Sequence, residues 1–120
     1  MQIFSKTDRG RVRTDNQDAY FAGKITDDAV FAVVCDGMGG ANAGNVASEL
    51  AVRHISEYVI RSYRSGMNMT DTEKTLKNAI VSANISLYDK AVNNTELAGM
   101  GTTTVAAFVK DGTAVIAHVG

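Results

Sequence analysis

The sequence predicts an α+β fold in which a pair of helices packs on one face of an antiparallel sheet. Two observations predict it. Apolar, β-branched runs bounded by glycine or aspartate occur before residue 38 and after residue 101, whereas apolar residues recur at helical spacing in between. The first pattern is typical of strands and the second of amphipathic helices. Strands before and after two helices favour separate α and β layers.

The composition is that of one globular domain. The chain has 120 residues, 45% of them hydrophobic and 21% charged, with a net charge of −1. This balance predicts no nucleic-acid partner and no anionic membrane surface, and no apolar run approaches the roughly 20 residues of a membrane helix. Cys35 is the only cysteine. A single apolar thiol suits a reducing compartment, so we expect a cytoplasmic protein.

The first part of the chain predicts strands joined by turns. Residues 2–7 fit a short strand. Tyr20–Ala22 and Ala29–Cys35 flank the turn-forming segment Gly23–Asp28, which predicts an antiparallel hairpin. Ala29–Cys35 is apolar throughout, and such a run is typical of a strand buried on both faces.

Two helices are expected next. The first runs from Ala43 to about Tyr63, and Ser65-Gly66 ends it. The second opens at Thr70–Glu73, which has the capping-box pattern, and fades near Ala91–Asn94. Its expected buried face consists of Leu76, Ala79, Ile80, Ala83, Leu87 and Tyr88.

A second hairpin is expected after the helices. Thr102–Val109 and Thr113–Val119 have strand composition. Asp111-Gly112 lies between them, and Asp-Gly is a strong signal for a two-residue hairpin turn.

An acidic, glycine-rich corner follows the strand Ala29–Cys35. Asp36–Gly40 contains one carboxylate and three glycines where the chain leaves the core. One interpretation is an ordinary Asp-Gly turn. The other is a cation or phosphate site, because a charged group beside the core needs a partner and glycines permit close backbone approach.

The hairpin register brings a second carboxylate to this corner. With the tip near Asp27, Asp18 lies opposite Asp36, with Cβ atoms roughly 4.5–5.5 Å apart. Facing carboxylates repel unless a cation or proton lies between them. Mg²⁺ and Mn²⁺ prefer oxygen ligands, so Asp18, Asp36 and the Gly37 carbonyl form the candidate metal site. Zinc fits less well, because Cys35 alternates away from the corner and neither histidine is near in sequence.

Other signals are weaker. Arg13 is a candidate for binding a phosphate in bidentate fashion, although its spacing in the sequence alone favours a solvated surface arginine. Gly99–Thr104 is a weak signal for a phosphate cradle, and such a segment is more often a loop that enters an edge strand. We expect His54 and His118 to be packed or hydrogen-bonded and assign neither a catalytic role. The corner's glycines do not match the G-x-G-x-x-G spacing, so a nucleotide-binding loop is set aside.

Several short motifs, in order, resemble those of metal-dependent protein phosphatases of the 2C type. Met38, where animal relatives commonly have histidine, makes the chain look like the bacterial branch. The resemblance spans essentially the whole chain and rests on Thr7–Arg13, Asn16–Asp18, Asp36–Gly40, Gly101–Thr103 and His118–Gly120.

This resemblance implies a fold, a reaction and residue roles. The fold is an α-β-β-α sandwich, of which this chain is the N-terminal portion. The reaction is hydrolysis of phosphoserine and phosphothreonine in proteins by two Mn²⁺ or Mg²⁺ ions, which share and activate a water. Asp36 would bridge both metals, Gly37 would give a backbone carbonyl, Asp18 would hold metal-bound water and Arg13 would bind the substrate phosphate. Gln17 stands where the family often has Glu and is not counted as a ligand.

The resemblance also shows what is missing. Family members run to roughly twice this length, so we expect residues 1–120 to be a partial domain, truncated at its C-terminus and inactive by itself. The alternative is a non-catalytic, phosphatase-like interaction module. Expected partners are phosphorylated proteins and a cognate serine/threonine kinase. Exposed apolar sheet surface should favour self-association.

Overall fold

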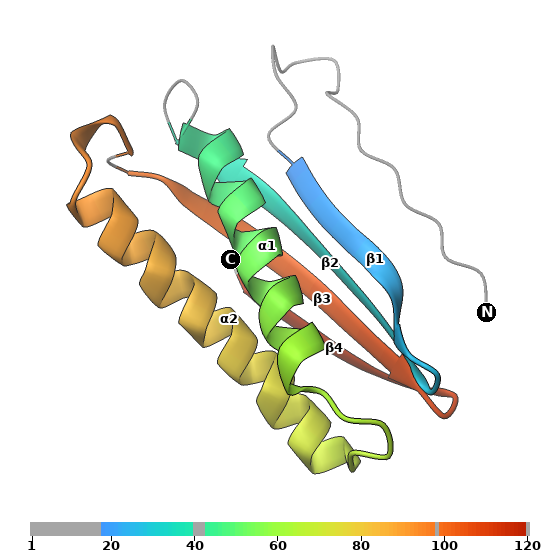
Figure 1. Ribbon diagram of the computed structural model, residues 1–120. Helices are drawn as coiled ribbons and strands as arrows, with labels where there is room; N and C mark the ends of the chain where they lie inside the picture. Colours follow the sequence, from blue (N-terminus) through green and yellow to red (C-terminus); the bar gives the residue numbers. More distant parts are fainter. Residues whose placement is uncertain (1–17, 40–42, 98, 120) are drawn as a thin grey trace, which may run out of the picture.

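The computed structural model describes residues 18–39, 43–97 and 99–119. Within them, four antiparallel strands form one sheet in the order β1-β2-β3-β4, and both helices lie on the same face of it (Figure 1). This confirms the α+β prediction; the strand predicted at 2–7 lies outside the described residues. The elements are β1 (Asp18–Thr26), β2 (Ala29–Met38), α1 (Ala43–Ser62), α2 (Met69–Val92), the 3₁₀ turn η1 (Thr95–Leu97), β3 (Gly101–Lys110) and β4 (Thr113–Val119).

Both predicted hairpins form. The first turns at Asp27-Asp28, a shorter connection than the predicted loop, because β1 continues through Gly23–Thr26 with a register shift before its end. The second turns at Asp111-Gly112, where both residues have positive φ (51° and 72°), as a type I′ turn requires. The short turns fix the strand registers, and the register of the first hairpin is the one that the sequence predicts.

Strand β2 is buried on one face only, which corrects the prediction of two buried faces. Phe31, Val33 and Cys35 are fully buried beneath the helices, whereas Val34 between them is 49% exposed. Side chains alternate across a strand, so alternate β2 residues point away from the helices. Among the described elements none covers that second face, which we call the outer face of the sheet.

The core lies between the sheet and the helices. Helix α1 packs over β1, β2 and β3, and its buried face includes Ala47, Ala51, Ile55 and Val59. Aromatic rings cross the sheet beneath it. The centroid of the Phe31 ring lies 5.9 Å from that of Phe108, and the Phe108 centroid lies 4.8 Å from that of Tyr63. These ring contacts join β2 to β3 and connect the sheet to the end of α1.

The start of α2 differs from the predicted capping box. Asn68 is the N-cap, and its side chain accepts a hydrogen bond from the Asp71 amide at 2.7 Å, so the helix begins two residues earlier. Asparagine caps helices as well as serine or threonine does. Five of the six residues of the predicted buried face are buried, but Tyr88 is 70% exposed. In the described part of the chain, neither helix is long and apolar enough to cross a membrane.

Asp28 connects the turn between β1 and β2 to the loop between α1 and α2 through hydrogen bonds. Its carboxylate accepts hydrogen bonds from Thr26 Oγ1, from the Gly66 amide at 3.0 Å and from the Tyr63 hydroxyl at 2.9 Å. The hydrogen bond from Thr26, followed by that from Gly66, holds the pKa of the Asp28 carboxyl well below its usual range. Asp28 therefore stabilises the fold in its ionised form.

Replacing Asp28 by asparagine is expected to lower the free energy of unfolding at pH 7. The free energy of unfolding of the variant should also change less than that of the parent when the pH is lowered to 3. The folded-state pKa lies below the unfolded value of about 3.9, so the stabilisation is present above that value and is lost as pH falls through it. Urea unfolding at pH 7 and at pH 3 measures this. The exposed neighbour Asp27, changed to asparagine, is the matched control. An equal loss of stability on acidification in the parent and in Asp28→Asn would contradict the assignment.

Candidate metal centre

The corner between β2 and α1 is held by a close backbone approach. A Cβ placed on Gly37 would lie 1.8 Å from the Gly44 carbonyl oxygen in the first turn of α1. Gly39 has φ of 141°, and a Cβ there would lie 2.8 Å from the Ala43 Cβ. Only glycine fits at either position. The predicted close approach is confirmed, but the partner is the protein's own helix.

Two carboxylates face each other beside this corner. Asp18 pairs with Asp36 across β1 and β2, as the sequence predicts, and both side chains are partly buried. Asp36 alternates with Cys35, whose side chain lies under the helices, so the two carboxylates lie on the outer face. The nearest neighbour from β3 on that face is Thr103, which is paired with Asp36.

The corner is also braced from β3. Thr102 is paired with Gly37, and its hydroxyl shares its one proton between the Thr103 carbonyl oxygen at 2.8 Å and the Asp36 carbonyl oxygen at 3.1 Å. The contact with Asp36 helps to hold the backbone that carries the carboxylate. In the sequence the threonine-rich strand is only a weak phosphate-binding signal, and the contact of the Thr102 hydroxyl with Asp36 was not predicted. The alignment of Asp-Gly in one strand with Thr-Thr in the next could have indicated it.

The chemistry of this donor set fits a hard divalent cation. Two carboxylates on one face, beside backbone carbonyls and a hydroxyl, supply only oxygen ligands. In the part of the chain that the structure describes, no group of three or more His, Cys, Asp or Glu side chains is close enough to hold a metal ion. Asp18 and Asp36 by themselves therefore offer a site with few protein ligands, and we expect weak affinity.

The remaining predicted residues fall in different places. Arg13 lies outside the described residues. His54 Nε2 lies 2.8 Å from Ser82 Oγ and links α1 to α2, as expected for a structural histidine. His118 is exposed on β4 and therefore is not packed, and the alternative expectation of a local hydrogen bond stays a prediction. Neither histidine lies on the strands that carry the carboxylates.

Cys35 is not available for metal or nucleophilic chemistry. Its side chain is fully buried, and its Sγ lies 3.5 Å from Thr104 Oγ1. Burial raises the pKa of the Cys35 thiol, so the thiol stays protonated at neutral pH. The prediction that zinc fits poorly agrees with this position under the helices.

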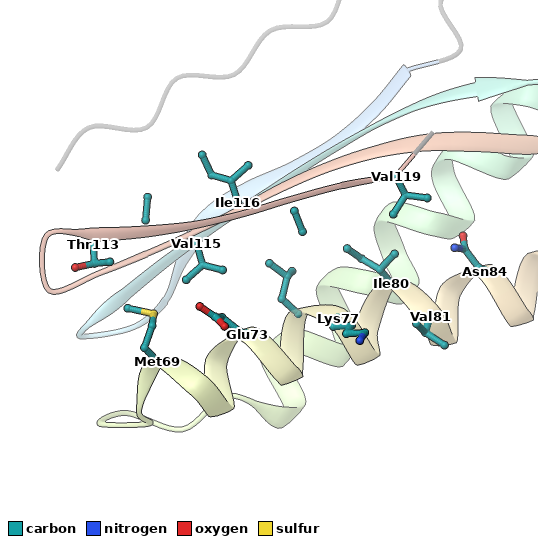
Figure 2. Close-up of a pocket in the computed structure, with 13 residues that line it drawn as sticks. Met69, Glu73, Lys77, Ile80, Val81, Asn84, Thr113, Val115, Ile116 and Val119 are labelled. Atoms are coloured by element: carbon teal, nitrogen blue, oxygen red, sulfur yellow. The ribbon is translucent and has the colours of Figure 1, made fainter.

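A groove in the described part of the chain lies away from the carboxylate pair. It has a volume of about 630 Å³ and runs between α2 and β4, on the helix side of the sheet. Figure 2 shows Val115 pointing from β4 toward α2, and Ile116 pointing away from α2. The groove is mainly apolar, with Glu73 and Lys77 on its helix wall. The carboxylate pair lies on the opposite face of the sheet and is not part of it.

The chain is similar in sequence to known protein phosphatases. The family profile of protein phosphatase 2C matches residues 7–120. The serine/threonine phosphatase stp of Listeria monocytogenes is 38% identical over 115 residues, which are 96% of this chain and 45% of that protein. The serine/threonine protein phosphatase PstP of Mycobacterium tuberculosis is 30% identical over 120 residues, which are 100% of this chain and 21% of that protein.

Solved structures agree with this fold. The crystal structure of the serine/threonine phosphatase of Staphylococcus aureus matches with a TM-score of 0.84 at 36% identity, over 96% of this chain and 44% of that one. The chain thus spans less than half the length of the relatives to which it is similar.

Proposed function

The chain belongs to the protein phosphatase 2C family, and we propose that it forms part of the catalytic centre of a protein serine/threonine phosphatase that depends on Mn²⁺ or Mg²⁺. The proposed reaction is hydrolysis of phosphoserine and phosphothreonine in proteins, with two metal ions in the complete domain. Its proposed partners are phosphorylated proteins and a cognate serine/threonine kinase. The buried, reduced Cys35 favours a cytoplasmic setting.

One observation supports this proposal most strongly. Asp18 and Asp36 are directly opposed across β1 and β2, in a segment that the family profile covers. Like charges directly opposite in a sheet are destabilising by themselves. Two carboxylates in this position offer the oxygen ligands that hard divalent cations prefer, and this match supports the proposed metal centre.

Each residue has a proposed role. Asp36, Asp18 and the Gly37 carbonyl would hold the cation, and Asp18 would also orient the attacking water by accepting a hydrogen bond from it. Arg13 binds the substrate phosphate through its guanidinium fork. Divalent ions, when bound, supply Lewis acidity and offset charge on the phosphoryl oxygens. The hydrogen bond from the Thr102 hydroxyl to the Asp36 carbonyl oxygen helps to hold the backbone that carries the carboxylate.

A chimera of this chain with a related phosphatase tests the proposed phosphatase activity. In a chimera, residues 6–120 replace the first part of the Listeria phosphatase, to which this chain is 38% identical. We expect Mn²⁺-dependent phosphate release from a phosphothreonine peptide, reduced at least about 100-fold by Asp36→Asn. Malachite-green detection of phosphate measures it, and a thermal melt shows whether the chimera is folded.

The outcomes separate the two classes of function. A folded chimera that binds the phosphopeptide without releasing phosphate would favour the non-catalytic interaction module. Release that does not depend on Mn²⁺ or Mg²⁺, or that survives Asp36→Asn unchanged, would contradict the proposed metal centre.

A further inference from the structure

The helix layer exposes an apolar stripe on the second half of α2. In the described part of the chain, every large apolar side chain that the helices expose lies in this stripe except Ile60 of α1. We call Val81, Ile85, Tyr88 and Val92 the α2 stripe; they are 48%, 58%, 70% and 63% exposed. Apolar residues scattered singly over a surface are ordinary, whereas a contiguous apolar stripe marks an interaction surface.

The α2 stripe lies on the side of the helix opposite the core. At about 100° per residue, its four side chains fall within a sector of about 60°, roughly 150° from the mean direction of the residues that α2 buries. Both helices cover the same face of the sheet (Figure 1). In an α-β-β-α sandwich the second sheet covers the other face, so the outward side of the helix layer stays at the surface. We therefore expect the stripe to be exposed in a complete domain as well.

The spacing of the α2 stripe is that of a short coiled-coil seam. Its successive residues are four, three and four positions apart, and alternating steps of four and three place side chains at the a and d positions of a coiled coil. The same positions one heptad earlier hold Lys74 and Asn78, and α2 ends directly after the stripe, so the apolar seam is limited to residues 81–92. The steps read the same in both directions, so the stripe is symmetrical about a midpoint between Ile85 and Tyr88. A symmetrical stripe matches a copy of itself that runs in the opposite direction.

We propose that the α2 stripe binds the α2 stripe of a second copy of this chain, with the two helices antiparallel about a two-fold axis that passes through the midpoint of the stripe. Val81 of each copy then packs against the partner's Val92, and Ile85 packs against the partner's Tyr88. This order places each tyrosine ring on an aliphatic side chain, and tyrosine is common at interfaces because it combines a large apolar ring with a polar end. The interface is isologous and closes at two subunits.

The residues that flank the α2 stripe are compatible with the antiparallel order. On one flank, reversal of the helix brings Ser82 beside the partner's Asp89, so a hydroxyl donor meets a carboxylate acceptor. Ser82 Oγ lies 2.8 Å from His54 Nε2, so this flank already carries a polar contact between α1 and α2. On the other flank, Asn84 lies beside the partner's Ala91. Of these four flanking residues only Asp89 is charged, so the pairing brings no like charges together.

The size of the α2 stripe predicts a weak dimer. A seam over residues 81–92 is about 18 Å long, and a helix with its side chains is about 10 Å wide, so the footprint is roughly 200 Å² on each copy. Interfaces that bury less than about 1,200 Å² of accessible surface in total are typical of weak or transient complexes. We expect a dissociation constant of about 10 to 100 μM. This inference does not depend on the proposed phosphatase activity.

Cross-linking of cysteine variants tests the antiparallel order. Val81→Cys and Val92→Cys are prepared separately in the 120-residue chain, in which the native Cys35 is fully buried. A short bismaleimide should join one variant to the other in a mixture but should join neither variant to itself. The reason is that, in the proposed dimer, position 81 lies about 16 Å along the helix axis from the same position in the partner. Cross-linking of Val81→Cys to itself, or no cross-linking in the mixture, would overturn the proposal.

Sedimentation velocity of the 120-residue chain, in EDTA and from about 1 to 300 μM, measures the strength of the dimer. We expect a reversible monomer–dimer equilibrium that Ile85→Lys weakens at least tenfold. Val105→Lys is the matched control, because Val105 is 52% exposed on the outer face of the sheet, away from α2, and it should leave the equilibrium unchanged.

The outcomes distinguish the helix layer from the sheet as the interface. Circular dichroism melts verify that each variant is folded. A monomer at every concentration, or a dimer that survives Ile85→Lys, contradicts the proposed interface. A dimer that Val105→Lys abolishes also contradicts it, since that dimer would use the outer face of the sheet.

Discussion

Replacing Gly37 by alanine is expected to destabilise the fold by at least about 3 kcal/mol. The new methyl group would lie 1.8 Å from the Gly44 carbonyl oxygen, and both groups belong to backbone in regular structure, so neither can move without separating β2 from α1. Thermal unfolding followed by circular dichroism should show a fall in midpoint of roughly 10 °C or more.

Gly101 supplies the control for this change. It lies on β3 at the same end of the sheet, and a Cβ there would meet only the Met38 side chain, at an ordinary 3.5 Å. Gly101→Ala should change stability by less than about 1 kcal/mol, because strand glycines gain little from lacking a side chain. Equal effects of the two substitutions would show that the contact with Gly44 does not determine the need for glycine.

The fold could be predicted where a short sequence pattern favours the same local structure that the tertiary fold adopts. The Asp27 tip sets the register of the first hairpin, so the pairing of Asp18 with Asp36 followed from the sequence. The cap at Asn68 was missed because Thr70, two residues later, also has a side chain that can cap a helix, whereas the structure uses the Asn68 side chain to accept the Asp71 amide hydrogen bond. Burial of β2 on both faces was wrong because an apolar run does not reveal whether a second layer covers it.

The two carboxylates of the candidate site could be predicted from the sequence. The contacts that hold their backbone in place could not. Side-chain type and register identify Asp18 and Asp36. The contact of Gly37 with Gly44 depends on how α1 leaves the corner, and the bond from Thr102 joins residues 66 positions apart. Such long-range contacts have no local sequence signal. The role of Arg13 stays a prediction, because that residue lies outside the described part of the chain.

Replacing Asp36 by asparagine is expected to weaken Mn²⁺ binding by the chain at least tenfold. Loss of even an outer-shell partner typically costs 10- to 100-fold in metal affinity, and Asp36 is proposed as a direct ligand beside only one other described carboxylate. Electron paramagnetic resonance of free Mn²⁺ gives the affinity directly. Because a ligand that binds only the folded state raises its stability, millimolar Mn²⁺ should also raise the melting midpoint of the parent and not that of the variant.

Asp27→Asn is the control for this experiment, because it makes the same change of charge at an exposed turn at the opposite end of the sheet. It should leave both Mn²⁺ readouts unchanged, which separates a site from a general attraction of cations to an acidic protein. Asp18→Asn should reproduce the effect of Asp36→Asn, and the double variant should add little, since both carboxylates serve one ion. If Mn²⁺ bound equally well to Asp36→Asn and to the parent, the facing carboxylates would need another explanation, and the proposed metal centre would be wrong.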